Sequence, residues 1–412
     1  AVRVMAPSTA GSLTEAELRD PCTQAYGRFS HDAVTPLVQL DHRHFLLELF
    51  HGPTLAFKDV ALQLLGLFFE RFLKGTDQHL TIVGATSGDT GSAAIDAVAG
   101  REGIDIFMLH PNKRVSDVQR RQMTTVLSPN VHNIAIEGSF DDAQAMVKAM
   151  FNDADFAGRF QVTAVNSINW ARLMAQVVYY FYAAVRLGAP NREVAFSVPT
   201  GNFGDVFAGY VAARMGLPVA KLIVATNVND ILHRALSAGD YSTGTVTPTA
   251  APSMDIQVSS NFERLLFDLA GRDGAALAEQ MRGFEASKAM RLTNAQQQGA
   301  ASLFASDRID AAEMAQAMAW AASRADEVLD PHTAIGLAAA RRADVAADVP
   351  VVTLATAHPA KFGDAVERAT GIRPTLPARI GDLFDREERY DVLPATFDAV
   401  TGYIAERAKP RS

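Results

Sequence analysis

Residues 80–109 read LTIVGATSGDTGSAAIDAVAGREGIDIFML, and this stretch decides the fold class. The apolar run Leu80–Gly84 is typical of a buried strand, and so is the run Ile104–Leu109. Between them, Gly91–Ala99 carries apolar residues at helical spacing. A strand, a helix and a second strand in such short succession predict a βαβ unit, in which the strands are parallel and the crossover is right-handed.

The same alternation continues along the chain in both directions. Further buried strands are predicted at 45–50, 131–136, 161–165, 194–198, 221–226 and 349–354. Helices are predicted at 55–73, 115–126, 140–151, 168–187, 203–215 and 363–370. The segment 240–261, rich in Thr, Ser and Pro, is expected to be a long functional loop, and 262–345 to be mostly helical. Together these elements predict an α/β protein with two α/β units.

The length and charge of the chain indicate the number of domains and argue against some kinds of partner. The chain has 412 residues, with 38 Lys and Arg against 46 Asp and Glu. At roughly 150 residues per domain, this length indicates two to three domains. The net charge of −8 comes without a basic run, which argues against nucleic acid as a partner. The longest aromatic and aliphatic run, Val177–Val185, is too short for a membrane span of about 20 residues.

The cysteine content and the N-terminus bear on the compartment. Cys22 is the only cysteine, so the chain has no internal disulfide and no cysteine-based metal site, and no metal is predicted. A reducing compartment, the cytoplasm, is therefore expected. Residues 1–45 are expected to form a helix and then a short strand. Ala1–Ser12 has no apolar core of a signal peptide, and because the chain does not begin with Met, further sequence is expected before Ala1.

Each of three predicted strands is followed by a loop of small and polar residues that leads into a helix. These loops are 85–91 (ATSGDTG), 199–205 (PTGNFGD) and 356–361 (TAHPAK). Because ligands of open α/β sheets bind beyond the carboxyl ends of the strands, the three loops predict one shared crevice. Neither G-x-G-x-x-G nor the Walker motif occurs, which weakens the case for NAD or ATP. Any one loop by itself is better explained as an ordinary turn with capping residues.

Lys58 is the fourth candidate feature. It follows the Gly52-Pro53 turn and begins an apolar helix. One interpretation is a lysine whose stem lies along that helix while its ammonium group reaches water. The other is a partly desolvated amine, which loses its proton readily and can form a Schiff base with a carbonyl. Composition alone does not choose between them.

Six segments occur together in one known enzyme family, in the same order. They are 50–59 (FHGPTLAFKD), 85–91 (ATSGDTG), 165–169 (VNSIN), 198–205 (VPTGNFGD), 225–230 (ATNVND) and 356–362 (TAHPAKF). They resemble the threonine synthase family of pyridoxal-phosphate enzymes, in its longer bacterial and fungal branch. The resemblance runs from about residue 35 to residue 370 and so covers most of the chain.

The resemblance implies a fold as well as a cofactor. The fold is type II of the pyridoxal-phosphate enzymes, with two open, mostly parallel twisted sheets, helices on both faces and an N-terminal helical segment. It implies an N-terminal segment at 1–45, which is expected to be incomplete. It also implies a large cofactor-binding domain at 46–77 and 190–412 and a smaller α/β domain at 78–189. Closure of the smaller domain on substrate binding is a further hypothesis.

The resemblance also implies roles for individual residues. Lys58 holds pyridoxal 5'-phosphate by a Schiff base and then moves protons, and Thr356 meets the pyridine nitrogen. The cofactor-binding set is Lys58, Ser87, Asp89, Thr90, Gly201, Asn202, Phe203, Gly204, Asp205 and Thr356. The set for the substrate phosphate or carboxylate is Thr86, Ser87, Asn166, Ser167, Arg172 and Lys361. Asn stands in the related fold where this chain has Asp89, so the role of Asp89 differs from the family pattern.

The implied reaction converts O-phospho-L-homoserine and water to L-threonine and phosphate, by γ-elimination followed by β-addition of water. The implied protein is a monomer or homodimer with no nucleic-acid or membrane partner. Two alternatives stay open. One is a threonine-synthase-like phospho-lyase or a serine or threonine dehydratase of the same fold, which yields a keto acid. The other is a pyridoxal-phosphate-binding protein without catalytic activity.

Overall fold

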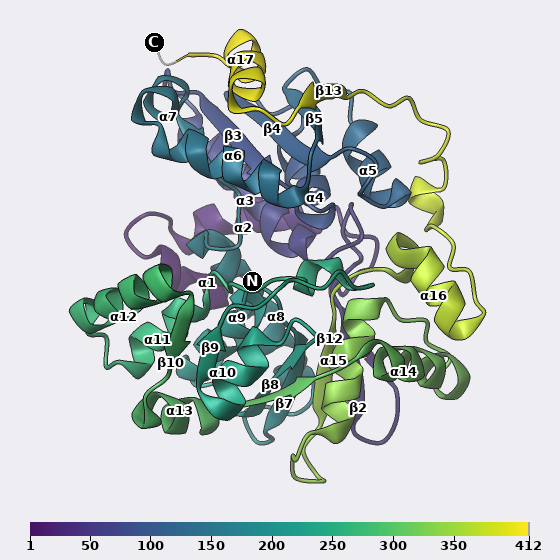
Figure 1. Ribbon diagram of the computed structural model, residues 1–412. Helices are drawn as coiled ribbons and strands as arrows, with labels where there is room; N and C mark the ends of the chain where they lie inside the picture. The colour runs from purple at the N-terminus through teal and green to yellow at the C-terminus, as the bar shows by residue number, and fades with distance from the viewer. Residues whose placement is uncertain (411–412) are drawn as a thin grey trace.

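The computed structural model describes residues 1–410, which contain two mostly parallel sheets (Figure 1). The larger sheet has six strands, and only its edge strand β1 runs antiparallel to its neighbour. In spatial order the strands are β1 (Leu37–Gln39), β2 (His44–Glu48), β12 (Val351–Ala355), β7 (Val194–Pro199), β8 (Val219–Thr226) and β11 (Phe304–Arg308). The predicted α/β class is confirmed.

The second sheet has five strands, and all its pairs are parallel. In spatial order these are β13 (Asp391–Pro394), β5 (Val131–Glu137), β4 (Ile104–Pro111), β3 (Leu80–Ala85) and β6 (Val162–Thr163). The βαβ unit predicted for 80–109 is therefore correct. A separate antiparallel pair joins β9 (Asp240–Ser242) to β10 (Ala289–Arg291), within segments expected to be loop and helix.

Helices cover both faces of the six-stranded sheet, because side chains alternate between two cores along each strand. On β12, Val352 and Leu354 belong to the core that contains α8 and α9, whereas Val351 and Ala355 belong to the core that contains α14 and α15. The helices around this sheet are α8 (Trp170–Arg186), α9 (Gly204–Arg214), α10 (Ile231–Ala238), α11 (Phe262–Leu269), α12 (Gly274–Ser287), α13 (Asn294–Ala301), α14 (Ala311–Arg324), α15 (Pro331–Arg342) and α16 (Gly363–Thr370).

Other helices flank the five-stranded sheet or lie between the sheets (Figure 1). They are α4 (Asp89–Val98), α5 (Asp117–Thr124), α6 (Phe140–Asn152), α7 (Ala154–Phe160) and α17 (Phe397–Arg407) at the sheet, and α1 (Val2–Thr9), α2 (Glu15–Tyr26) and α3 (Lys58–Leu73) between the sheets. Short 3-10 turns are η1 (Pro252–Met254), η2 (Pro359–Phe362) and η3 (Ala378–Ile380). Within the described part of the chain, no helix is long and apolar enough to cross a membrane.

The C-terminal segment returns from one sheet to the other. After α16 it runs along one side of the molecule to the five-stranded sheet, where it adds β13 and α17 (Figure 1). The predicted boundaries placed all of 190–412 in the large domain, whereas β13 pairs with β5 of the five-stranded sheet and α17 packs against β13 and α6. The signal in Asp391–Pro394 is weak because this edge strand is mostly exposed and lacks a continuous apolar run. The division into domains stays a proposal.

His110 on β4 makes the stability of the fold pH-dependent. It is 1% exposed, and neither ring nitrogen has a hydrogen-bond partner among the described residues. Burial lowers its pKa to about 4, against about 6.5 in an unfolded chain. Between these values the unfolded chain binds more protons, so stability falls as the pH falls from 6.5 towards 4. The free energy of unfolding should drop by about 3 kcal/mol more in the parent than in His110→Phe between pH 7 and pH 4.

Urea unfolding of both proteins, followed by circular dichroism at several pH values, measures this difference. The two curves of stability against pH should be parallel above pH 7 and diverge below it. Parallel curves over the whole range would contradict the assignment of this acid sensitivity to His110.

Candidate active site

The loops at the carboxyl ends of β3, β7 and β12 lie near the start of α3, where Lys58 is the first residue. Backbone hydrogen bonds join the two segments: Phe57 N–H donates to Thr356 O at 2.8 Å, and His358 N–H donates to Leu55 O at 3.0 Å. An isolated antiparallel bridge between Ala56 and Ala357 completes the contact. Lys58 and Thr356, which are far apart in the sequence, are thereby placed side by side.

Lys58 is buried, with 8% of its surface exposed. Its Nζ lies 3.4 Å from Asp89 Oδ2 and 4.7 Å from the centre of the Phe57 ring. Burial lowers the pKa of the Lys58 amine, and the attraction of Asp89 offsets this only in part. The structure therefore favours the desolvated amine over a lysine that reaches water along the helix.

Asp59, the residue after Lys58, fixes the turn that precedes Lys58 in the chain. The Asp59 carboxylate accepts hydrogen bonds from the Thr54 N–H at 2.8 Å and from the Thr54 hydroxyl at 2.7 Å. A Cβ at Gly52 would overlap the Asp59 side chain, so only glycine fits there. Full burial raises the pKa of Asp59 to about 6 despite the two hydrogen bonds from Thr54.

Asp89 lies at the centre of a buried polar cluster. Its Oδ1 accepts from Lys361 Nζ at 2.8 Å and from Gln119 Nε2 at 2.8 Å, while its Oδ2 faces Lys58. Burial alone would raise the pKa of Asp89, but the Lys361 ammonium group, the nearby Lys58 amine and the hydrogen bond from Gln119 outweigh burial and hold that pKa well below its usual range. Asp89 is thus a fixed anion beside the Lys58 amine.

The other residues of the 85–91 loop divide into two kinds. The Thr86 hydroxyl accepts from the N–H groups of Gly88 and Gly91, both at 2.9 Å, and therefore holds the loop itself. Ser87 and Thr90 are half-buried, and their hydroxyls have no hydrogen-bond partner among residues 1–410. Of the hydroxyl ligands predicted in this loop, Ser87 and Thr90 are the ones that remain available.

The Gly201–Asp205 loop forms the start of α9. Gly201 O accepts from the Ser259 hydroxyl at 2.8 Å, and Asn202 O accepts from Asn261 Nδ2 at 3.0 Å. The N–H of a trans peptide points opposite to its C=O, so the N–H groups of residues 202 and 203 face the other side. Phe203 has φ +64°, which turns the chain into the helix. These N–H groups and those of the first turn of α9 make a site that suits an anion.

Phe203 and Asp205 support this loop from the interior. The Phe203 ring packs on Phe262 at 5.2 Å between centroids. The Asp205 carboxylate accepts hydrogen bonds from Tyr179 and Tyr180, and its Oδ2 has no partner among the described residues. Burial raises the pKa of Asp205 to about 6. The side chains of both residues therefore point into the core, and only their backbone is placed for a ligand.

Thr356 is buried, and its backbone N–H donates to the Thr333 hydroxyl at 3.2 Å. The Thr333 hydroxyl in turn donates to Asp330, a fully buried carboxylate. Asp330 also accepts from His332 Nδ1 at 2.7 Å, and His332 Nε2 accepts from the Ser253 N–H at 3.3 Å. Asp330 therefore links the Thr356 loop to the segment that packs on Gly201.

The residues expected for the substrate phosphate or carboxylate have different environments. Arg172 on α8 is 4% exposed, and its Nε has no partner among the described residues, while one terminal nitrogen donates to Val165 O at 2.8 Å. Burial lowers the pKa of Arg172 to about 10. Ser167 Oγ lies 3.2 Å from Ser260 Oγ, and Asn166 is exposed. Lys361, by contrast, is 1% exposed and already paired with Asp89.

Several residues of this site were not predicted from the sequence. They are Asp59, Gln119, Tyr179, Tyr180, Ser259, Asn261, Asp330, His332 and Thr333. Ser259 and Asn261 do lie in the segment 240–261, whose composition predicts a functional loop. Asp59 lies in the 50–59 segment but was not singled out there. The others lie in helices or at the start of one, where polar residues give no periodic signal of a site.

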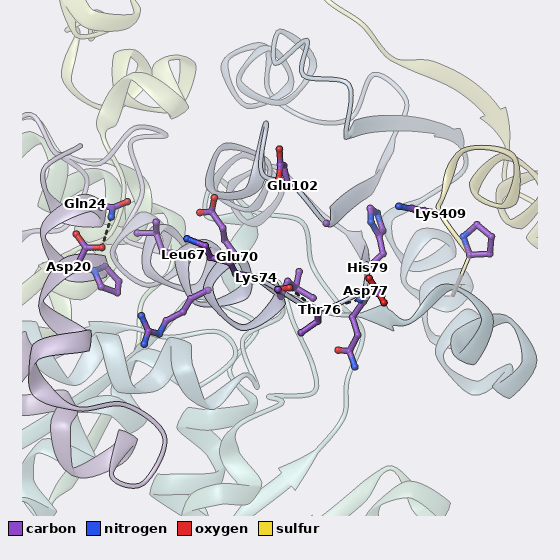
Figure 2. Close-up of a pocket in the computed structure, with 17 residues that line it drawn as sticks. Asp20, Gln24, Leu67, Glu70, Lys74, Thr76, Asp77, His79, Glu102 and Lys409 are labelled. Atoms are coloured by element: carbon purple, nitrogen blue, oxygen red, sulfur yellow. Dashed lines mark hydrogen bonds between the residues drawn. The ribbon is translucent and has the colours of Figure 1, made fainter. Parts of the chain in front are cut away.

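A large hollow of about 1130 Å³ lies elsewhere, between α2, the end of α3 and the residues before the C-terminus (Figure 2). Figure 2 shows charged side chains of both signs around it, among them Glu70, Lys74 and Lys409. None of the predicted site residues lines it. The cluster around Lys58 therefore remains the candidate active site.

Comparison with known proteins identifies the family. Residues 29–301 match the family model "Pyridoxal-phosphate dependent enzyme", and residues 333–404 match "Threonine synthase, C-terminal". The chain is 55% identical to threonine synthase of Pseudomonas aeruginosa over 100% of this chain and 88% of that protein. It is 44% identical to threonine synthase of Corynebacterium glutamicum, over 92% of this chain and 81% of that protein.

Solved structures agree. A crystal structure of pyridoxal-phosphate-bound threonine synthase from Brucella melitensis has a TM-score of 0.95 and 51% identity, covering 99% of this chain and 89% of that chain. Threonine synthase from yeast has a TM-score of 0.92 and 39% identity, covering 98% of this chain and 88% of that chain. The chain has the type II fold of pyridoxal-phosphate enzymes, and it belongs to the threonine synthase family.

Proposed function

We propose that this chain converts O-phospho-L-homoserine and water to L-threonine and phosphate, with pyridoxal 5'-phosphate attached to Lys58. The observation that carries the proposal is the Lys58 amine itself. It is buried, its pKa is lowered, and it lies beside the Thr356 loop and the Asp89 carboxylate. An amine that loses its proton readily is the group that a carbonyl cofactor requires.

The residues around Lys58 fit this cofactor. The N–H groups at the start of α9 suit its phosphate, and Gly201 keeps the loop free of a Cβ where it packs on Ser253. The Thr356 hydroxyl is the proposed neighbour of the pyridine nitrogen, which a hydroxyl is too weak an acid to keep protonated. Ser87 and Thr90 offer hydroxyls for the ring oxygen or the substrate carboxylate. When bound, pyridoxal phosphate supplies an electron sink for negative charge that develops on the substrate carbons.

The chain's own residues have two tasks in this reaction, proton transfer and phosphate binding. Lys58 Nζ removes the proton from the substrate Cα and returns it at the end. A second proton leaves Cβ, phosphate departs from Cγ, Cγ gains a proton and water supplies the hydroxyl at Cβ. The Arg172 guanidinium, with Ser167 and Asn166 beside it, is the proposed binding group for the phosphate, because its Nε is buried without a partner. Lys361 was also proposed for this role, but it is already paired with Asp89.

Product identity tests the proposal. The loaded enzyme is incubated with O-phospho-L-homoserine, and phosphate, threonine and 2-oxobutyrate are measured together. Equal amounts of phosphate and threonine support the proposal. Phosphate with 2-oxobutyrate instead would indicate a phospho-lyase on the same scaffold. If a protein that carries the cofactor forms neither threonine nor 2-oxobutyrate, the proposed catalytic role is refuted.

The compartment and the assembly belong to the proposal as well. The chain is proposed to act in the cytoplasm, which its single buried cysteine supports. The proposed assembly state is a monomer or a homodimer. Cell fractionation and light scattering test these two points.

A further inference from the structure

Two lysines share one buried carboxylate in the site. Lys361 Nζ lies 2.8 Å from Asp89 Oδ1, and Lys58 Nζ lies 3.4 Å from Asp89 Oδ2. The side chains of Lys361 and Asp89 are 0% and 5% exposed. If both lysines were charged, two ammonium groups would lie against the single carboxylate of Asp89 inside the protein, and like charges held so close together disfavour the protonated form of one of them. One of the two lysines is therefore expected to give up its proton.

The contacts decide which lysine that is. Lys361 Nζ has two close acceptors, Asp89 Oδ1 and the carbonyl oxygen of Thr54 at 2.7 Å. Among residues 1–410, Lys58 Nζ has only the longer contact to Asp89 and the face of the Phe57 ring. The charged pair is thus Lys361 with Asp89, and Lys58 is the neutral amine.

We propose that Lys361 is a positioning residue that neutralises Asp89 and thereby keeps the Lys58 amine uncharged for attachment of the cofactor. The inference rests on the proposed function, in which Lys58 is the cofactor lysine. In that step the Lys58 nitrogen forms a C=N bond to the aldehyde carbon. The two hydrogens of the neutral amine and the aldehyde oxygen leave as water, and a protonated amine has no lone pair for the attack.

The effects of the other charged groups on the pKa of Lys58 agree with this role of Lys361. After burial, which is the largest influence, Asp89 raises the pKa of Lys58, whereas Lys361 and Arg172 lower it. Asp205 also interacts electrostatically with Lys58, from the start of α9. Removal of Lys361 takes away a nearby cation, and Lys58 then becomes the one lysine of the pair that still contacts the Asp89 carboxylate. Both effects raise the pKa of Lys58, so the direction of the change is unambiguous.

The experiment measures cofactor attachment rather than turnover. The full chain is stripped of cofactor and reloaded with pyridoxal 5'-phosphate between about pH 6 and about pH 10, and absorbance gives the rate. In Lys361→Met the midpoint of the rate profile should rise by about one pH unit, so that loading at neutral pH slows about tenfold. In Asp89→Asn the midpoint should fall. The double variant Lys361→Met/Asp89→Asn carries the same net charge as the parent, and its midpoint should return towards that of the parent.

The double variant separates an electrostatic role from a purely structural one, because loss of packing would not be repaired by a second substitution. Unchanged midpoints, or midpoints that move in the same direction in both single variants, would overturn the inference. If Lys361→Met does not fold, Asp89→Asn decides, since a midpoint that does not fall refutes the charge argument. Failure of the parent to attach the cofactor at Lys58 would instead refute the proposed function.

Discussion

Replacing Lys58 by alanine should lower the rate of threonine formation at least about a thousandfold, because the substitution removes both the attachment point and the proton carrier. Phosphate and threonine released from O-phospho-L-homoserine are measured for both proteins at saturating cofactor. Borohydride reduction followed by peptide mass spectrometry should find the cofactor on Lys58 in the parent and nowhere in the variant. The far-ultraviolet spectrum should not change, since alanine favours the first turn of α3.

Lys74 provides the matched control. It follows the same helix at its other end, is exposed, and lies outside the site. Lys74→Ala should therefore retain the parent rate and the parent peptide label. A Lys58→Ala protein that kept more than a tenth of the activity, or a label found on another lysine, would contradict the assignment of Lys58.

Replacing Gly201 by alanine should weaken cofactor binding about a hundredfold. The added Cβ would overlap the carbonyl oxygen of Ser253, a backbone atom that cannot rotate away. The loop must therefore shift, and with it the N–H groups that are proposed to hold the cofactor phosphate. A steric conflict of this kind costs about 2 to 3 kcal/mol, which matches the expected loss.

Affinity is measured by equilibrium titration of the stripped protein with pyridoxal 5'-phosphate, followed by absorbance. The control is Gly283→Ala in α12, where no atom lies within 4 Å of the added Cβ. This substitution should leave cofactor affinity unchanged and stabilise the helix by about 0.5 to 1 kcal/mol. Equal affinities of the Gly201→Ala protein and the parent would show that the loop does not hold the phosphate.

The strands with continuous apolar runs could be predicted from the sequence. β3, β4, β7 and β12 all appear where their runs of buried residues indicated. The loops after β3, β7 and β12 come together near Lys58 as expected. In the two larger sheets, β11 and β13 were missed for a physical reason. β11 has the sequence FASDR and β13 has DVLP, so neither carries an apolar run, and each forms by pairing at the edge of a sheet.

The candidate site was predictable in its residue types but not in its contacts. Lys58, Gly201 and Thr356 lie in motifs that are local in the sequence, and each is found in the site. Lys361 was expected to bind a phosphate because it is a cation in a matching motif. Its contact with Asp89 joins residues far apart in the chain, and the sequence carries no signal of that pairing.

The α/β class, the positions of the main strands, the loops that follow them and the membership in a family could all be predicted from the sequence, because they depend on local patterns of apolar and small residues. The protonation proposed for Lys58, by contrast, depends on the tertiary structure. Burial removes water from Lys58, and folding places Asp89, Lys361 and Arg172 around it. Electrostatic interactions act through space and depend on solvent exclusion, so the charge of an amine follows from the folded arrangement and not from its neighbours in the chain.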